Sequence, residues 1–121
     1  MTHKIYEMPV ADVYPQYINK VVKKGRTEAE LQEVIHWLTG FDSKKLKKLL
    51  ESKTSFREFF KQAELHDNAE LITGTICGVK IQEIEDPLMK KIRFLDKLVD
   101  ELAKGRPMEK ILRKQPVKLG L

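Results

Sequence analysis

The stretch over residues 86–105 carries the strongest constraint on the fold of this chain. Its apolar residues recur at intervals of three and four, which places them on one face of an α-helix. The residues on this face are Leu88, Ile92, Leu95, Val99 and Leu102. Asp86 can accept hydrogen bonds from the free amides of the first turn, and Pro87 suits the first helical position because it has no N–H to satisfy. The pattern predicts a core-facing helix against which the remaining segments pack.

Upstream segments carry further helix signals. The clearest is the pair Thr27 and Glu30, a capping box in which each side chain can bind the other residue's backbone amide. The predicted fold is mainly α, a single compact domain of five to six helices over residues 1–121. The other predicted helices begin between Asp12 and Pro15, at Asp42 or Ser43, and at Ser55, and one more spans residues 107–114. Residues 67–73 could form a further short helix.

Three segments lack a helical pattern. Residues 1–10 are predicted to form an extended arm, and residues 115–121 a loosely ordered tail. Near residues 76–84, Val79 and Ile81 alternate with polar neighbours, which favours a short β-strand or an extended connection. A lone strand needs a partner, so we expect this segment to pair with residues 4–8.

Length and composition limit the class of protein. A chain of 121 residues forms one domain with a modest core, and 41% hydrophobic with 34% charged residues is typical of a soluble, charge-rich protein. No apolar run approaches the ~20 residues of a membrane span, and the N-terminus lacks the apolar core of a signal peptide. One cysteine allows no intramolecular disulfide. These features predict a cytoplasmic protein.

The net charge of +5 is distributed in alternating blocks. The blocks are residues 1–26 at +3, 27–42 at −4, 43–63 at +5, 64–86 at −5, 87–105 at +2 and 106–121 at +4. Such alternation suggests that segments attract one another across the fold. It does not predict a single basic face, and so gives little support to nucleic-acid binding.

The densest basic cluster lies on the helix predicted after Asp42. Its members are Lys44, Lys45, Lys47 and Lys48. This helix and the preceding one resemble a helix-turn-helix in outline. The cluster contains no Asn, Gln or Arg of the kind that reads base edges, so a solvated lysine face is the preferred interpretation.

A second group of candidates could form a pocket. His36 lies next to the single tryptophan, Trp37, but adjacent helical residues point about 100° apart, so we expect a buried tryptophan and a surface histidine. Phe59 and Phe60 are typical of a core and could instead line a pocket. Cys77 could be a nucleophile, although a lone cysteine in an apolar stretch is more often a small buried residue.

Metal and cofactor sites are not predicted. The histidines and Cys77 are too far apart in sequence to match a known metal-binding spacing, and the glycines match no phosphate-binding loop. Self-association is predicted from two surfaces. Phe94 lies outside the apolar face of its helix, and the segment around Val79 lacks a clear partner strand. A twofold homodimer would cover both.

Several stretches together resemble a known family: GRTEAELQEVIHWLTGFD, the pair Phe59 and Phe60, ITGTICGVKIQEIEDPLMKKIRFLDKLVDELAKG, and MEKILR. They are similar to bacterial domain-of-unknown-function family 2200 over residues 4–113. Prolines that such members carry between the phenylalanine pair and the ITG block are missing here. The resemblance implies a small soluble bacterial protein, and it brings no catalytic residue, cofactor or partner.

The sequence therefore favours a small, non-enzymatic interaction or regulatory module. Two alternatives stay open. One is a nucleic-acid-binding protein that uses the lysine face and the basic C-terminus, and the other is a ligand-binding protein or enzyme with a site near Trp37 and Cys77.

Overall fold

The helix α6 (Pro87–Ala103) is the element against which most others pack in the computed structural model, which describes residues 4–76 and 78–113. It begins as predicted, because the Asp86 carboxylate accepts a hydrogen bond of 2.9 Å from the Leu88 amide and Pro87 occupies the first position. Its side chains Leu95, Leu98 and Leu102 are fully buried. The predicted organising helix is confirmed.

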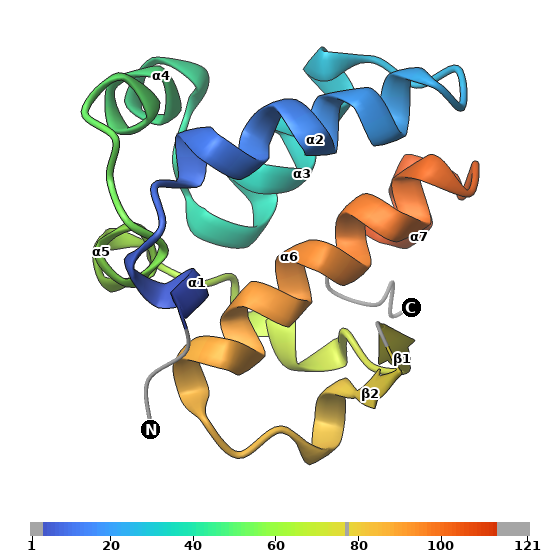
Figure 1. The fold of residues 1–121 in the computed structure, drawn as a ribbon. Coiled ribbons are helices and arrows are strands. Elements are labelled where there is room, and N and C mark those ends of the chain that lie inside the picture. Colours follow the sequence, from blue (N-terminus) through green and yellow to red (C-terminus); the bar gives the residue numbers. More distant parts are fainter. Residues whose placement is uncertain (1–3, 77, 114–121) are drawn as a thin grey trace.

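The architecture is mainly α-helical, as predicted (Figure 1). α2 and α3 pack against α6 and against each other, while α5 and α7 contact α6 at other points along its length. The elements besides α6 are α1 (Lys4–Glu7), α2 (Val10–Val22), α3 (Glu28–Thr39), α4 (Ser43–Glu51), α5 (Phe56–Gln62), the 3-10 helices η1 (Asp67–Leu71) and η2 (Ile81–Glu83), the strands β1 (Thr75–Ile76) and β2 (Val79–Lys80), and α7 (Met108–Ile111).

The predicted helix starts at the capping residues are confirmed. Thr27 and Glu30 form the reciprocal capping box at the start of α3, with hydrogen bonds of 3.1 and 3.0 Å. Asp42 accepts a hydrogen bond from the amide of Lys45 at the start of α4. Ser55 accepts one from the amide of Glu58 at the start of α5. Each contact spans three residues, so local sequence is sufficient to specify it.

The predicted extended arm is wrong for residues 4–10. Lys4–Glu7 form the helical turn α1, and α2 already begins at Val10. Tyr6 is buried and its hydroxyl donates a hydrogen bond to the Asp86 carboxylate. Burying this aromatic ring against the start of α6 offsets the conformational entropy that is lost when the N-terminal turn is ordered. Local helix propensity does not include this contribution. Residues 1–3 lie outside the described part of the chain.

The short β-strand predicted as one form of residues 76–84 is present, but the predicted pairing of this segment with residues 4–8 is wrong. β1 and β2 form an antiparallel hairpin in which Thr75 faces Lys80 and Ile76 faces Val79. Residues 4–8 do not pair with it. The N-terminal segment instead meets the start of α5, through a bridge between Pro9 and Ser55. A hairpin forms more readily because its two strands are adjacent in sequence.

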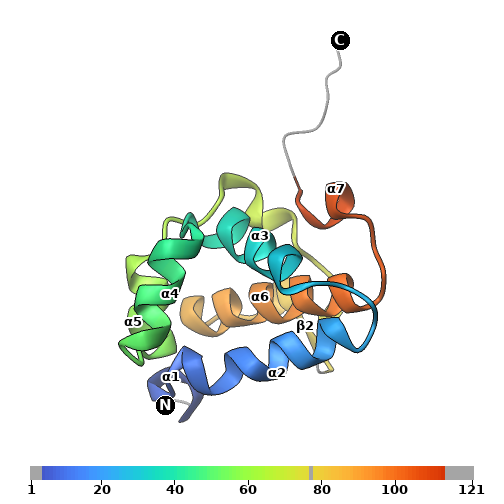
Figure 2. The same cartoon turned by 90° about the horizontal axis from the view of Figure 1, so that it is seen from above.

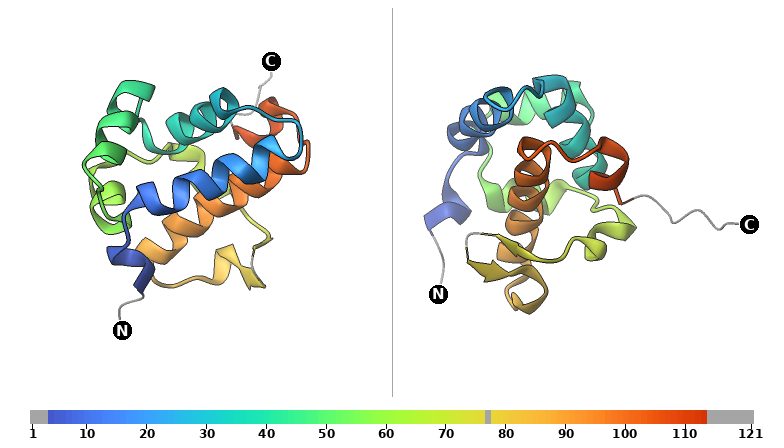
Figure 3. Two further views of the ribbon diagram at one scale, coloured as in Figure 1. Left: turned by 45° about the horizontal axis from the view of Figure 1, so that its top comes forward. Right: turned by 90° about the vertical axis from the view of Figure 1, so that its right-hand side faces the viewer.

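Phe94 is buried, with 1% of its surface exposed, which corrects the prediction of an exposed ring. α6 lies between two layers. α2 and α3 cover one side, and the hairpin with η2 lies on the other (Figures 2 and 3). Both arguments for a homodimer, the exposed Phe94 and the unpaired strand, therefore no longer hold, and self-association stays a prediction.

Ion pairs join blocks of opposite charge less often than the sequence suggested. Lys90 in a basic block does bridge Glu70 in an acidic one, at 3.2 Å. The pairs Lys20–Asp100 and Arg57–Glu7, however, each join two basic blocks. None of the helices in the described residues is long and apolar enough to cross a membrane.

Candidate functional site

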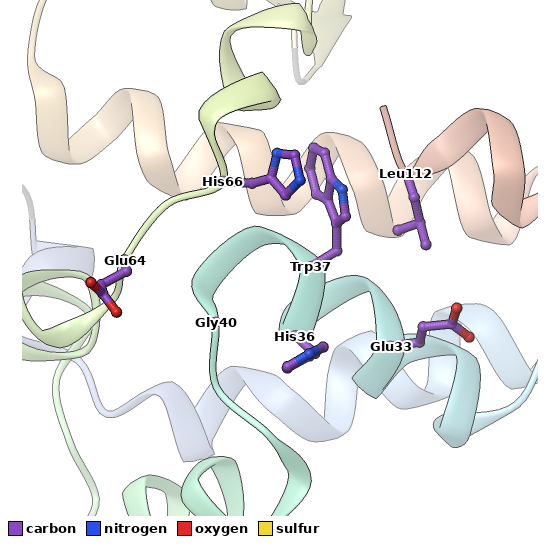
Figure 4. Close-up of a pocket in the computed structure, with 7 residues that line it drawn as sticks. All are labelled: Glu33, His36, Trp37, Gly40, Glu64, His66 and Leu112. Carbon is purple, nitrogen blue, oxygen red and sulfur yellow. The ribbon is translucent and has the colours of Figure 1, made fainter. Parts of the chain in front are cut away.

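A pocket of about 450 Å³ lies at the C-terminal end of α3 (Figure 4). It is built from three segments that are distant in sequence: the last turns of α3, the segment after α5, and the residue after α7. The lining residues are Glu33, His36, Trp37, Gly40, Glu64, His66 and Leu112.

Backbone hydrogen bonds bring the segment after α5 to this end of α3. The amide of Glu64 donates to the Thr39 carbonyl at 3.0 Å, and the amide of His66 donates to the Leu38 carbonyl at 3.1 Å. These are carbonyls of the last turn, which have no partner within a helix. Gly40 ends α3 at φ 81°, a left-handed conformation that strains other residues. The end of α3 therefore positions both sides of the pocket.

Trp37 is the central side chain of the pocket. Its surface is 9% exposed, and His66 stacks on the indole with ring centroids 4.4 Å apart and planes inclined by 20°. Figure 4 shows the indole between His66 and Leu112. The indole Nε1–H is buried and has no hydrogen-bond partner among the described residues. An unpaired buried donor is uncommon in folded proteins and calls for an explanation.

The two histidines of the pocket have different neutral tautomers. His36 Nδ1 lies 3.1 Å from the Phe41 carbonyl, and because a carbonyl can only accept, Nδ1 carries the proton. His66 Nδ1 accepts a hydrogen bond of 2.9 Å from the Asn68 amide, so its proton is on Nε2. The other ring nitrogen, Nε2, is therefore an acceptor in the neutral form of His36 and a donor in His66.

The rim of the pocket is acidic. Glu33 and Glu64 are both exposed. They belong to the two negatively charged blocks, residues 27–42 and 64–86, which the fold brings together here. The arrangement combines apolar walls, one buried donor and two carboxylates, which suits binding of a small organic molecule. In the described residues, no group of three His, Cys, Asp or Glu side chains is placed to hold a metal ion.

The predicted pocket candidates have separate positions in the structure. His36 and Trp37 both line the pocket, although they point in different directions from α3, because the pocket wraps around the end of the helix. Trp37 is buried and His36 exposed, as expected. Phe59 and Phe60 do not line the pocket. They are core residues with 0% and 1% exposure, and their rings meet edge to face. Cys77 lies outside the described residues.

Five residues of the pocket were not among the pocket candidates predicted from the sequence: Glu33, Gly40, Glu64, His66 and Leu112. Glu33 lies one helical turn before Trp37, so the helical repeat could have indicated it. His66 and Leu112 are 29 and 75 residues from Trp37. No local pattern connects residues so far apart.

The lysine cluster forms an exposed face of α4, as expected. Lys44, Lys45, Lys47 and Lys48 are all exposed, and none forms an ion pair with another described residue. Lys44 and Lys47 also border a shallow hollow of about 550 Å³ next to Tyr14. Tyr14 donates a hydrogen bond to Glu28 and accepts one from Gln32. These contacts pair the Tyr14 hydroxyl, and among the described residues no buried side-chain donor or acceptor of the hollow is left without a partner.

The family model described as "Uncharacterized protein conserved in bacteria (DUF2200)" matches residues 4–113. The chain belongs to this family. The chain is also similar to the crystal structure of the uncharacterized protein SP1917, with which it shares 43% sequence identity. That likeness covers 94% of each chain and has a TM-score of 0.87. No curated protein matches the chain. The resemblance noted from the sequence is thus confirmed, and these DUF2200 comparisons assign no activity.

Proposed function

We propose that this protein is a non-enzymatic binding module whose ligand is a small organic molecule held in the Trp37 pocket. The observation that carries the proposal is the buried, unpaired Nε1–H of Trp37, a residue that lines a pocket open to solvent. We place its action in the cytoplasm, in keeping with the single cysteine.

The energetic argument concerns the buried donor. Leaving a polar group buried without a hydrogen bond costs about 1–3 kcal/mol. A ligand that supplies an acceptor oxygen or nitrogen would recover much of this energy on binding. The walls formed by Trp37, His66 and Leu112 suit an apolar ring, and the Glu33 and Glu64 carboxylates disfavour a negatively charged one. The proposed ligand is therefore a neutral or cationic ring compound that carries a hydrogen-bond acceptor.

The single tryptophan makes the proposal directly testable, because the protein gives only one indole N–H signal in a two-dimensional ¹H–¹⁵N NMR spectrum. A fragment set would include benzamide, which combines a ring with an acceptor, and toluene, which has the ring alone. We expect benzamide-type fragments to shift the Trp37 indole signal, with dissociation constants on the order of 1 mM. We expect toluene to shift it less.

Trp37→Phe is the control variant, because it keeps an aromatic ring in the wall and removes the donor together with one ring of the indole. In this variant the backbone amides of Gly40 and Leu112 report binding. The affinity for benzamide should fall several-fold and that for toluene should not. If no fragment of the set shifts the Trp37 signal in the wild-type protein, the proposal is wrong.

A further inference from the structure

A polar, basic surface covers the exposed side of α2 from Gln16 onwards and continues onto the end of α6. We call it the α2 surface, and its first part is a shallow groove of about 340 Å³ lined by Gln16, Asn19, Lys20, Lys23 and Lys24. A second groove, of about 550 Å³, adjoins it and shares Lys20 and Lys24. This second groove is completed by Asp100, Ala103, Lys104 and Gly105.

The surface exists because α2 and α6 pack side by side with their C-terminal ends at the same end of the molecule (Figure 1). This arrangement joins two basic blocks that are about 80 residues apart in sequence. The one acidic side chain in the grooves is Asp100, which pairs with Lys20 at 3.2 Å and with Lys104 at 3.1 Å. Burial opposes its ionisation, but these two ammonium groups outweigh that effect and lower its pKa. The negative charge of Asp100 is thus already neutralised.

Lys23 and Lys24 keep their charge available. Both are exposed, and neither forms an ion pair with a described residue. Lysines at a helix C-terminus also complement the helix dipole, which accounts for their position. That effect does not account for Gln16 and Asn19, which lie in the middle of α2 on the same exposed side. A row of amide side chains leading into lysines is the combination that the lysine face of α4 lacks.

We propose that the α2 surface binds duplex DNA, with the exposed side of α2 lying in the major groove. The major groove is about 12 Å wide and admits an α-helix, and Asn and Gln are the side chains that pair with adenine edges. Lys23 and Lys24 would contact phosphates on the groove walls. α2 has 13 residues and thus a length of about 20 Å, enough to span the groove. This proposal does not depend on the Trp37 pocket.

The test is fluorescence anisotropy with a labelled 20-base-pair DNA duplex, measured from 50 to 200 mM salt. Two phosphate contacts predict a slope of log K against log salt of about −2. Lys23→Gln with Lys24→Gln should reduce the slope by about two and weaken binding at 50 mM salt at least tenfold. The matched control is Lys44→Gln with Lys48→Gln on α4, which makes the same change in net charge. It should weaken binding less than threefold.

A second variant separates the contribution of contacts inside the major groove from that of the phosphate contacts. Gln16→Ala with Asn19→Ala should weaken DNA binding and leave the salt slope unchanged, because it removes no phosphate contact. Thermal melting of each variant confirms that it is folded. Three results would overturn the proposal: no binding at 50 mM salt, a loss in the α4 variant as large as that in the α2 variant, or tighter binding to an RNA duplex or to phosphatidylserine vesicles than to DNA.

Discussion

Arg113 binds Glu101 through two parallel hydrogen bonds of 2.7 Å, and the Glu101 side chain is only 6% exposed. Arg106 adds a third contact to the same carboxylate at 3.1 Å. The Arg113 carbonyl also accepts a hydrogen bond of 2.7 Å from Asn68. This network fixes the segment after α7 to α6 and η1, and it therefore positions Leu112, one wall of the Trp37 pocket.

We predict that Arg113→Met destabilises the protein by about 3 kcal/mol. The variant leaves a buried carboxylate with one cation instead of two, and an incompletely paired buried charge is costly. Urea unfolding measures the effect. The double variant Arg113→Met with Glu101→Leu should be more stable than Arg113→Met alone, because it removes the buried charge as well. Arg57→Met serves as the control, since the Arg57–Glu7 pair is exposed and should contribute less than about 1 kcal/mol. A double variant no more stable than the single one would contradict this account.

Phe94→Ala should destabilise the protein by about 3–5 kcal/mol, because it leaves a cavity where a fully buried ring was packed. Leu95→Ala should cost about 2–5 kcal/mol for the same reason. The control is Val22→Ala, at a position that is 52% exposed, which should have little effect. Thermal unfolding of the three variants tests the prediction. A loss at Phe94 as small as that at Val22 would place the ring in solvent.

Stability should fall as the pH rises from 10 to 12. Burial and the hydrogen bond to Asp86 raise the pKa of Tyr6 to about 12, and burial is the main cause that raises the pKa of Tyr14 to about 12. The unfolded chain releases these protons near pH 10, so each tyrosine stabilises the fold below that pH and this contribution is lost as pH rises through the folded pKa. Urea unfolding at pH 9 to 12 measures the decline. It should be shallower in Tyr6→Phe, and an identical slope would show that Tyr6 does not contribute.

Trp37→Phe should destabilise the protein much less than Trp37→Ala, because removal of the unpaired donor offsets part of the lost packing. The substitution removes a buried N–H that has no partner in the described structure and keeps a ring to stack on His66. Trp37→Ala should instead cost about 3–5 kcal/mol, because the ring itself is lost. Chemical denaturation of the two variants makes the comparison. If Trp37→Phe is destabilised as much as Trp37→Ala, the N–H has a stabilising partner.

Asp86→Ala should destabilise the protein by about 1 kcal/mol through the lost helix cap. The total loss should exceed this value, because the hydrogen bond from Tyr6 to Asp86 is lost as well. Asp86→Asn keeps an oxygen that can accept from the Leu88 amide and should recover part of the loss. Urea unfolding separates the two variants. Equal losses would mean that the capping oxygen contributes nothing.

The local sequence determined the helices and where they begin. Thr27 with Glu30, Asp42 and Ser55 cap helices through contacts only three residues long, and the repeat of leucines in α6 reports which face is apolar. These contacts could be predicted because both partners lie within one helical turn of each other.

Only the tertiary structure decided which surfaces are covered and what meets at the pocket. Phe94 is buried although it lies outside the main apolar face of α6, because α6 is packed on more than one side by other elements of the fold. Trp37 acquires His66 and Leu112 as neighbours because the free carbonyls at the end of α3 bind the amides of a distant segment. Packing between distant segments depends on the shape of all of them at once, so periodicity and capping signals contain no information about it.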